Sequence, residues 1–150
     1  GTATGTGRGE SITPIQSLPS LPVALICPSE TIPDKTARMF SRLTADQYTD
    51  GGRTERLAGI LEADGFVADM QYNVFELAAF QEFPELEVLR QQIRLATGAE
   101  VHLSGAGPAL YCLPSSEDEF QRVSHTLQPY GARVYLVHTI SPGSTPGVSG

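Results

Sequence analysis

Two short apolar runs on either side of a glycine-rich connection form the pattern around which the rest of the chain is arranged. Residues 101–103 and 109–113 alternate between apolar and other positions, which is the spacing of paired β-strands. The connection consists of Ser104, Gly105, Ala106, Gly107 and Pro108. Glycine adopts positive φ readily and leaves backbone N–H groups uncovered, so such a loop can hold an anion. It can equally be a plain strand connection, which the residues alone favour.

Apolar residues recur with helical spacing in five other segments. These are residues 34–43, 53–64, 74–80, 85–97 and 116–127. Pro84 and Gly98 are placed to start and stop the fourth helix, and Ser116 and Glu119 form a capping pattern at the fifth. We expect Asp34 to cap the first helix. The face of that helix expected to point inward contains Thr36, Met39, Phe40 and Leu43.

Three further segments have the composition of strands. Residues 23–27 form a continuous apolar run, residues 132–140 alternate, and Pro14 restricts residues 11–15 to an edge strand. The main elements then follow the order β-α-β-β-α-β of a ferredoxin-like split β-α-β sandwich, an α+β fold. This predicts an antiparallel sheet with helices on one face, and a helical insertion at about residues 53–80 in the first crossover.

Length and composition suit one ordinary globular domain. We expect residues 1–140 to form it and residues 141–150, a low-complexity tail, to be disordered. The formal charge is −7, and Lys35 is the only lysine, which argues against a nucleic-acid surface. No apolar run approaches the length of a membrane span, so cytoplasm is the default location. Cys27 and Cys112 both lie in apolar runs, which favours buried free thiols.

The residues alone supply no complete active site. Both glycine-rich places lack the third glycine of a dinucleotide fingerprint, and a Gly-Lys-Ser/Thr phosphate loop is absent. His102, His125 and His138 have no partner spacing that indicates a metal or a catalytic triad. We therefore predict no metal site and no catalytic residue within this chain.

Several motifs in a fixed order resemble a known family. They are the Gly-Arg-Gly-Glu head at residues 7–10, Lys35-Thr36-Ala37, Asn73, and Leu103-Ser104-Gly105-Ala106-Gly107-Pro108. In this order, the chain resembles the C-terminal half of the GHMP kinases over residues 1–140. Within the family the resemblance is to the branch that phosphorylates the 2-hydroxyl of a cytidine-diphosphate-linked methylerythritol in non-mevalonate isoprenoid biosynthesis.

The resemblance implies a ferredoxin-like C-terminal domain that works together with an N-terminal kinase domain. That other domain carries the main ATP-binding loop and the catalytic groups, so ATP and Mg²⁺ belong to the parent enzyme. The chain is then expected to be a C-terminal fragment that binds neither by itself and is inactive as a kinase. The loop from Ser104 to Pro108 is implied to lie near the nucleotide phosphates and the acceptor. Thr36 is implied to contact the acceptor, and Asn73 to lie near the cleft.

The chain departs from the family pattern in its glycine loop, and other interpretations remain beside it. Ala106 and Ala109 replace two hydroxyl residues, so an anion contact must come from backbone N–H groups or from Ser104. Asn73 can simply cap the helix that follows it, and Thr36 can belong to the core.

Two other functions also fit a ferredoxin-like domain: a free-standing metabolite-binding module, and a structural pairing module. The kinase-domain interpretation predicts an exposed surface beside Gly105 and a tendency to self-associate.

Overall fold

The computed structural model describes residues 2–16, 18–29, 34–63, 65 and 70–140. The chain divides into two compact units, and each is described by itself. The larger unit comprises residues 22–48 and 72–137; the smaller comprises residues 1–21, 49–71 and 138–150. The predicted tail at 141–150 lies outside the described residues.

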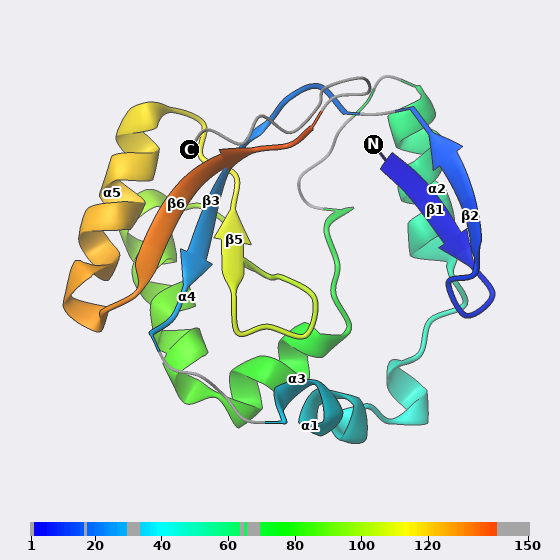
Figure 1. Cartoon of the computed structure of the whole chain (residues 1–150), viewed down its shortest axis with the longest axis horizontal. Helices are drawn as coiled ribbons and strands as arrows, with labels where there is room; N and C mark the ends of the chain where they lie inside the picture. The colour runs from blue at the N-terminus through cyan, green and yellow to red at the C-terminus, as the bar shows by residue number, and fades with distance from the viewer. Residues whose placement is uncertain (1, 17, 30–33, 64, 66–69, 141–150) are drawn as a thin grey trace, which may run out of the picture. The chain divides into compact units, whose positions relative to one another are not determined.

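A four-stranded sheet in the order β4-β5-β3-β6 forms the centre of the larger unit (Figure 1). Its strands are β3 (Pro22–Cys27), β4 (His102–Leu103), β5 (Leu110–Cys112) and β6 (Arg133–His138). Strand β5 is antiparallel to both neighbours, with Leu103 opposite Leu110 and Leu25 opposite Tyr111. The predicted pairing of the two runs around the glycine loop is therefore confirmed, as is the ferredoxin-like order.

Two helices, α4 (Pro84–Thr97) and α5 (Glu117–Leu127), cover one face of this sheet (Figure 1). Side chains alternate between the two faces of the sheet, so every second strand residue faces α4 and α5. Burial of these apolar side chains against the helices stabilises the fold. The core residues with no exposed surface include Ala24, Ile26, Leu86, Ile93, Leu110, Cys112, Val123 and Leu127. The sheet and the two helices thus form a single hydrophobic core.

The ends of these two helices follow the predicted signals. Pro84 is the first residue of α4, and Gly98, with φ of 75°, follows its last. The hydroxyl of Ser116 accepts a hydrogen bond from the Glu119 N–H at 3.2 Å, which caps α5. The carboxylate of Glu119 accepts in return from the backbone N–H of Ser115 at 2.8 Å, one residue earlier than in a standard capping box.

The remaining helices of the larger unit lie in the crossover between β3 and β4. They are α1 (Lys35–Arg42), a short 3-10 helix (Ala45–Gln47) and α3 (Phe75–Glu82), apart from a second 3-10 helix (Gln128–Tyr130) that lies between α5 and β6. Helix α1 packs against α3, where the rings of Phe40 and Phe75 meet edge to face with centroids 5.0 Å apart.

Two predictions for α1 were wrong. The side chain of Asp34 makes no capping hydrogen bond, and only its backbone carbonyl accepts, from the Arg38 N–H at 3.0 Å. On the face that was expected to be buried, only Met39 is fully buried. Thr36 is exposed, and the side chain of Phe40 is 61% exposed. An eight-residue helix that rests on another helix buries a narrower stripe than one covering a sheet.

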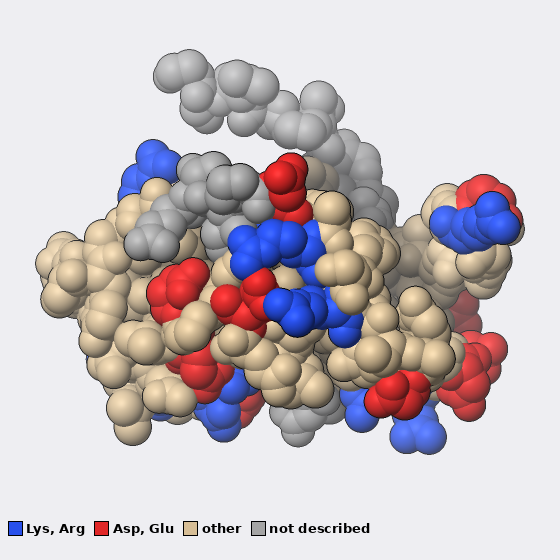
Figure 2. All heavy atoms as spheres, turned by 90° about the horizontal axis from the view of Figure 1, so that it is seen from below, with Lys and Arg blue, Asp and Glu red and all other residues tan. Residues whose placement is uncertain are grey.

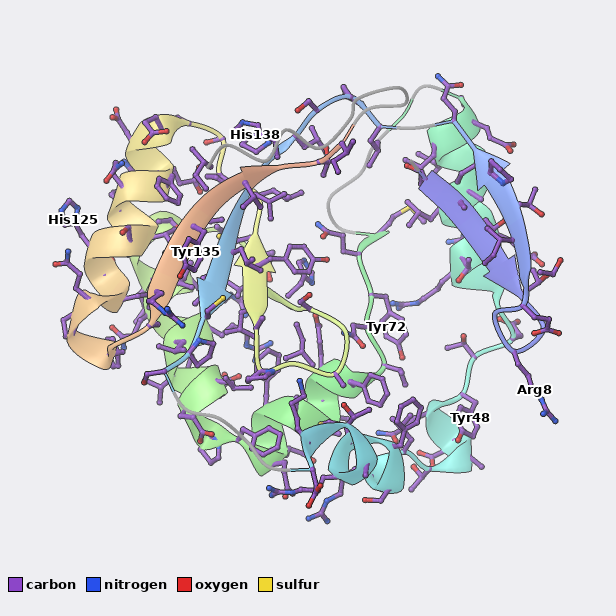
Figure 3. All side chains as sticks on the ribbon, in the orientation of Figure 1. Arg8, Tyr48, Tyr72, His125, Tyr135 and His138 are labelled. Carbon is purple, nitrogen blue, oxygen red and sulfur yellow. The ribbon has the colours of Figure 1, made fainter. Side chains whose placement is uncertain are left out.

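The smaller unit contains an antiparallel hairpin of β1 (Thr2–Thr6) and β2 (Ser11–Ile15), and helix α2 (Gly52–Glu62). The edge strand at 11–15 was predicted; β1 was not. Thr2, Thr4 and Thr6 supply a β-branched residue at every second position, a strand signal that the glycines in and beside this run obscure. At the tip, the Glu10 carboxylate accepts from the Arg8 backbone N–H, and the Arg8 side chain extends away from the hairpin (Figure 3).

No helix among the described residues is both long enough and apolar enough to cross a membrane.

Candidate functional site

The glycine loop, residues 104–108, is a tight turn closed by its own backbone. The Ser104 N–H donates to the Ala109 carbonyl and the Gly107 N–H donates to the Ser104 carbonyl, both at 2.9 Å. Gly105 and Gly107 have φ of 56° and 74°. A Cβ at Gly107 would lie 2.8 Å from Leu103 Cδ1, whereas a Cβ at Gly105 would meet nothing within 4 Å. A side chain at 107 must therefore displace Leu103, while the side of the loop at 105 is open.

The outer part of this loop retains backbone donors. Among the residues that the structure describes, no acceptor takes the N–H of Gly105 or of Ala106. Ser104 and Gly105 are exposed, and Ala106 is half-buried. Successive N–H groups around a left-handed residue form a concave donor set that suits an anionic oxygen. The loop therefore has the donors that the sequence predicted, and no hydroxyl at position 106 is needed to provide them.

Asn73 lies at the start of α3 and bonds to the glycine loop. Its Nδ2 donates to the carbonyls of Leu103 at 2.9 Å and of Gly105 at 2.7 Å. Its Oδ1 accepts from the Phe75 N–H at 3.0 Å, which caps the helix. The capping role that the sequence suggested is present, and the same side chain also joins the helix to the loop.

A second polar contact to the loop comes from Glu76, which sequence reasoning missed. Its Oε1 accepts from the Leu103 N–H at 2.9 Å and lies 3.2 Å from Nδ1 of His102. Burial opposes ionisation of this carboxyl. The hydrogen bonds with His102 and Leu103, together with electrostatic interactions with His102 and Arg90, outweigh it and lower the pKa of Glu76. The available signal was the spacing of three between Asn73 and Glu76 across a helix start.

The three histidines differ in their surroundings. His102 faces Glu76 and packs its ring 5.5 Å from that of Tyr111. His125 projects outward from α5 (Figure 3). Across the described residues, no group of three or more His, Cys, Asp or Glu side chains could hold a metal ion.

Thr36 is the one predicted site residue that the structure does not bring to the loop. It lies exposed in the first turn of α1, and within the described residues it has no hydrogen bond to residues 104–108. The interpretation of Thr36 as a core residue is wrong. An acceptor contact by Thr36 stays a prediction.

A network of ion pairs joins α1 to the end of α3. Arg42 Nη2 lies 2.7 Å from Glu82 Oε2, and Arg38 pairs with the other oxygen of the same carboxylate. A hollow of about 400 Å³ beside it is lined by Arg42, Gln47, Ala78, Gln81 and Glu82. Seen from this side, basic and acidic side chains lie intermixed and not in one single-sign field (Figure 2). Both arginines are therefore paired with Glu82 and are not free cations.

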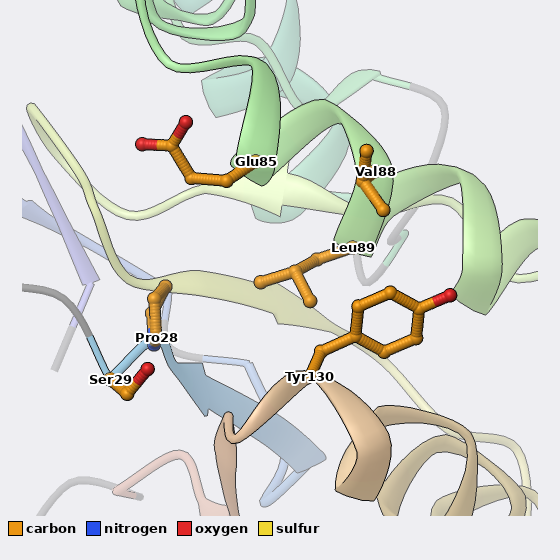
Figure 4. Close-up of a pocket in the computed structure, with 6 residues that line it drawn as sticks. All are labelled: Pro28, Ser29, Glu85, Val88, Leu89 and Tyr130. Atoms are coloured by element: carbon orange, nitrogen blue, oxygen red, sulfur yellow. The ribbon is translucent and has the colours of Figure 1, made fainter.

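A smaller apolar hollow, of about 170 Å³, lies between the end of β3 and the start of α4 (Figure 4). It is lined by Pro28, Ser29, Glu85, Val88, Leu89 and Tyr130. No residue of the glycine loop, Asn73 or Thr36 lines it. It is therefore separate from the candidate site.

Comparison with known proteins agrees with this geometry. A family model described as the GHMP kinases C terminal matches residues 50–132, more than half of the chain. The chain belongs to the GHMP kinase C-terminal family. The matched residues include Asn73, Glu76 and the whole glycine loop.

The chain is similar to a curated protein and to a solved structure of named GHMP kinases. A 4-diphosphocytidyl-2-C-methyl-D-erythritol kinase of Dehalococcoides mccartyi is 34% identical over 143 residues, which are 95% of this chain and 50% of that protein. The crystal structure of a 4-(cytidine 5′-diphospho)-2C-methyl-D-erythritol kinase matches with a TM-score of 0.69 and 26% identity, over 91% of this chain and 48% of that one.

A more distant structure extends the likeness of fold. The homoserine kinase from Cytophaga hutchinsonii matches with a TM-score of 0.58 at 20% identity, over 84% of this chain and 44% of that one. At this identity the likeness concerns the fold alone. The chain spans about half the length of the curated relatives it matches.

Proposed function

We propose that this chain is the substrate-side half of an ATP-dependent kinase acting on 4-diphosphocytidyl-2-C-methyl-D-erythritol. The parent enzyme transfers the γ-phosphoryl group of ATP to the 2-hydroxyl of this acceptor, a step of non-mevalonate isoprenoid biosynthesis in the cytoplasm. The observation that carries the proposal is the 34% identity, across 95% of the chain, to a kinase of that name.

The glycine loop supplies anion contacts in this function. Phosphoryl transfer depends on positioning and on stabilising the charge that spreads over the phosphate oxygens. The N–H groups of Gly105 and Ala106, which have no acceptor among the described residues, are proposed to donate to such an oxygen. The exposed hydroxyl of Ser104 is a third donor at the same edge. In this proposal the chain binds and orients phosphate.

The acceptor side is formed by the exposed surface of α1. Thr36 and Phe40 are four residues apart, one helical turn, and both are exposed. The edge contact between Phe40 and Phe75 braces the exposed ring from beneath. The hydroxyl and the ring thus present one polar and one apolar contact to an uncharged part of the acceptor.

The deciding experiment is a phosphotransfer assay on the full-length protein that contains the chain. With radiolabelled ATP, we expect label on 4-diphosphocytidyl-2-C-methyl-D-erythritol and none on homoserine, the acceptor named for a structural relative. Transfer to homoserine in preference, or no transfer to either, would refute the assignment. The 150-residue chain alone is expected to transfer nothing.

A binding experiment on the chain separates the kinase assignment from a free-standing module. Calorimetric titration of the chain with cytidine diphosphate is expected to show no binding with a dissociation constant below the millimolar range. The reason is that the other domain is proposed to complete the nucleoside pocket. Submillimolar binding by the chain alone would favour the metabolite-binding module. Sizing chromatography in the same buffer tests the prediction of self-association, and a discrete ligand-independent dimer would favour the pairing module.

A further inference from the structure

Every polar atom of the Asn73 carboxamide has a partner at the junction of α3 and the glycine loop. A carboxamide has two N–H donors and one acceptor oxygen. Both carbonyls that surround the loop's first residue, those of Leu103 and Gly105, accept from Nδ2, and Oδ1 accepts from Phe75 N–H. The donors of Asn73 are thus engaged by the backbone and are not available to a substrate.

Glu76 holds the same backbone segment from one turn further along α3. Its carboxylate accepts from the Leu103 N–H at 2.9 Å, while Asn73 takes the Leu103 carbonyl. The two side chains therefore bind the N–H and the C=O of one residue and the C=O of the residue two positions later. Such contacts restrict the orientation of the peptide planes at the entry to the loop, because each one holds one end of a different peptide unit.

The carbonyls that Asn73 binds lie next to the backbone N–H groups that have no acceptor in the described part of the chain. The Leu103 and Gly105 carbonyls point to Asn73, and the N–H groups without an acceptor among the described residues belong to Gly105 and Ala106. The Ala106 N–H is part of the same peptide unit as the Gly105 carbonyl. Because N–H and C=O point in opposite directions across a trans peptide, holding that carbonyl toward α3 directs the N–H away from it.

We propose that Asn73 and Glu76 are positioning residues that hold the glycine loop with its N–H groups turned outward, ready for the phosphate of a nucleotide. The proposal rests on the proposed function and deepens it. Asn73, expected from the family resemblance to lie near the cleft, then acts through the loop and not on the substrate. The loop is ordered before the anion arrives, so the anion does not have to supply the free energy of ordering it.

The test measures loop amides directly on the chain. In ¹H–¹⁵N spectra, the amide signals of Gly105 and Ala106 are followed during titration with inorganic pyrophosphate. We expect them to shift in the wild type, and in Asn73→Asp to shift only at about tenfold higher pyrophosphate, since the anion must then order the loop. Asn73→Asp keeps the size of the side chain and the Phe75 cap, but it sets a carboxylate oxygen against two carbonyls.

The matched control is Gln121→Glu. It makes the same amide-to-acid change on the exposed surface of α5, where Gln121 donates to Glu117 at 2.8 Å. This variant is expected to bind pyrophosphate as the wild type does. A second pair tests Glu76: Glu76→Gln retains an acceptor for the Leu103 N–H and should preserve most of the binding, whereas Glu76→Ala should lose it.

The outcomes separate failure of the inference from failure of the function. If the wild-type amides shift and those of Asn73→Asp shift equally, Asn73 does not position the loop. If the wild-type amides do not shift at all, the phosphate role of the loop is wrong, and the inference falls with it. If Asn73→Asp does not fold, Asn73→Ser, which can cap Phe75 but is too short to reach the loop, gives the same comparison.

One further measurement needs no variant. Asn73 is the only asparagine in the sequence, so selective labelling gives a single side-chain NH₂ signal. We expect this NH₂ group to be protected from solvent exchange compared with a free amide. Exchange at the rate of a free amide would contradict the two hydrogen bonds to the loop and overturn the proposal.

Discussion

The two glycines of the loop make a sharp stability prediction, because they share a backbone conformation and differ in their surroundings. Both have φ in the left-handed region, 56° at Gly105 and 74° at Gly107. A methyl group at 107 would lie 2.8 Å from Leu103 Cδ1, and one at 105 would lie in open space. Substituting each with alanine therefore separates backbone strain, which both share, from a steric clash, which only one has.

The expected sizes follow from these contacts. An alanine with positive φ costs about 1 kcal/mol, so Gly105→Ala should lower the free energy of unfolding by about that amount. Leu103 is only 2% exposed, and its side chain has little room to move away. Overpacking of this kind costs about 1–3 kcal/mol more, so Gly107→Ala should lose about 2–4 kcal/mol in total. The difference between the two variants isolates the clash.

Urea denaturation of the two variants and the wild type, followed by circular dichroism, measures this difference. With similar m-values, a gap of about 1–3 kcal/mol corresponds to a midpoint difference on the order of 1 M. Equal midpoints for the two variants would refute the steric argument. A double-mutant cycle checks the cause: in a Leu103→Ala background, which removes Cδ1, Gly107→Ala should cost only the strain of about 1 kcal/mol.

Three further predictions concern other parts of the larger unit. Because the pKa of Glu76 lies below its ordinary 4.5, its stabilisation is present above that pH and is lost as pH falls below it. Glu76→Gln should thus be less stable than wild type by about 1 kcal/mol at neutral pH, and urea midpoints at about pH 3 should converge; a constant gap would contradict this. Burial raises the pKa of Cys112 to about 12, so iodoacetamide should label the half-buried Cys27 first and Cys112 only after unfolding; equal labelling by mass spectrometry would count against the core. Ser116→Ala removes the cap of α5 and should cost about 1 kcal/mol in thermal melts, whereas no loss would show that the Glu119 contact to Ser115 suffices.

The site was predictable only in part from the residues. The glycine loop stood out because two glycines between alternating runs indicate a turn with uncovered N–H groups. Asn73 was expected to cap a helix and does so. Its bonds to Leu103 and Gly105 span 30 and 32 residues, and no local pattern encodes a contact at that separation. Glu76 was missed for the same reason, since its partners, His102 and Leu103, lie on strand β4.

Local periodicity by itself determined the types and order of the main elements of the larger unit, and with them the ferredoxin-like fold. Strands alternate with period 2 and helices repeat with period 3.6, so each pattern carries its own structure and its own buried face. This worked for α4, α5 and the hairpin of β4 and β5, where the apolar stripe faces a sheet or helix that covers it fully. It failed for α1, where the expected face is mostly exposed because a second helix covers only a narrow part of it.

Tertiary structure alone decided how α3 meets the glycine loop. The crossover from β3 brings the start of α3 beside the connection of β4 and β5, and only then do the side chains of Asn73 and Glu76 reach the loop backbone. The physical reason is that a turn of this kind can form in several orientations from its own sequence. Hydrogen bonds from a distant helix hold the Leu103 and Gly105 backbone in the orientation that the structure has.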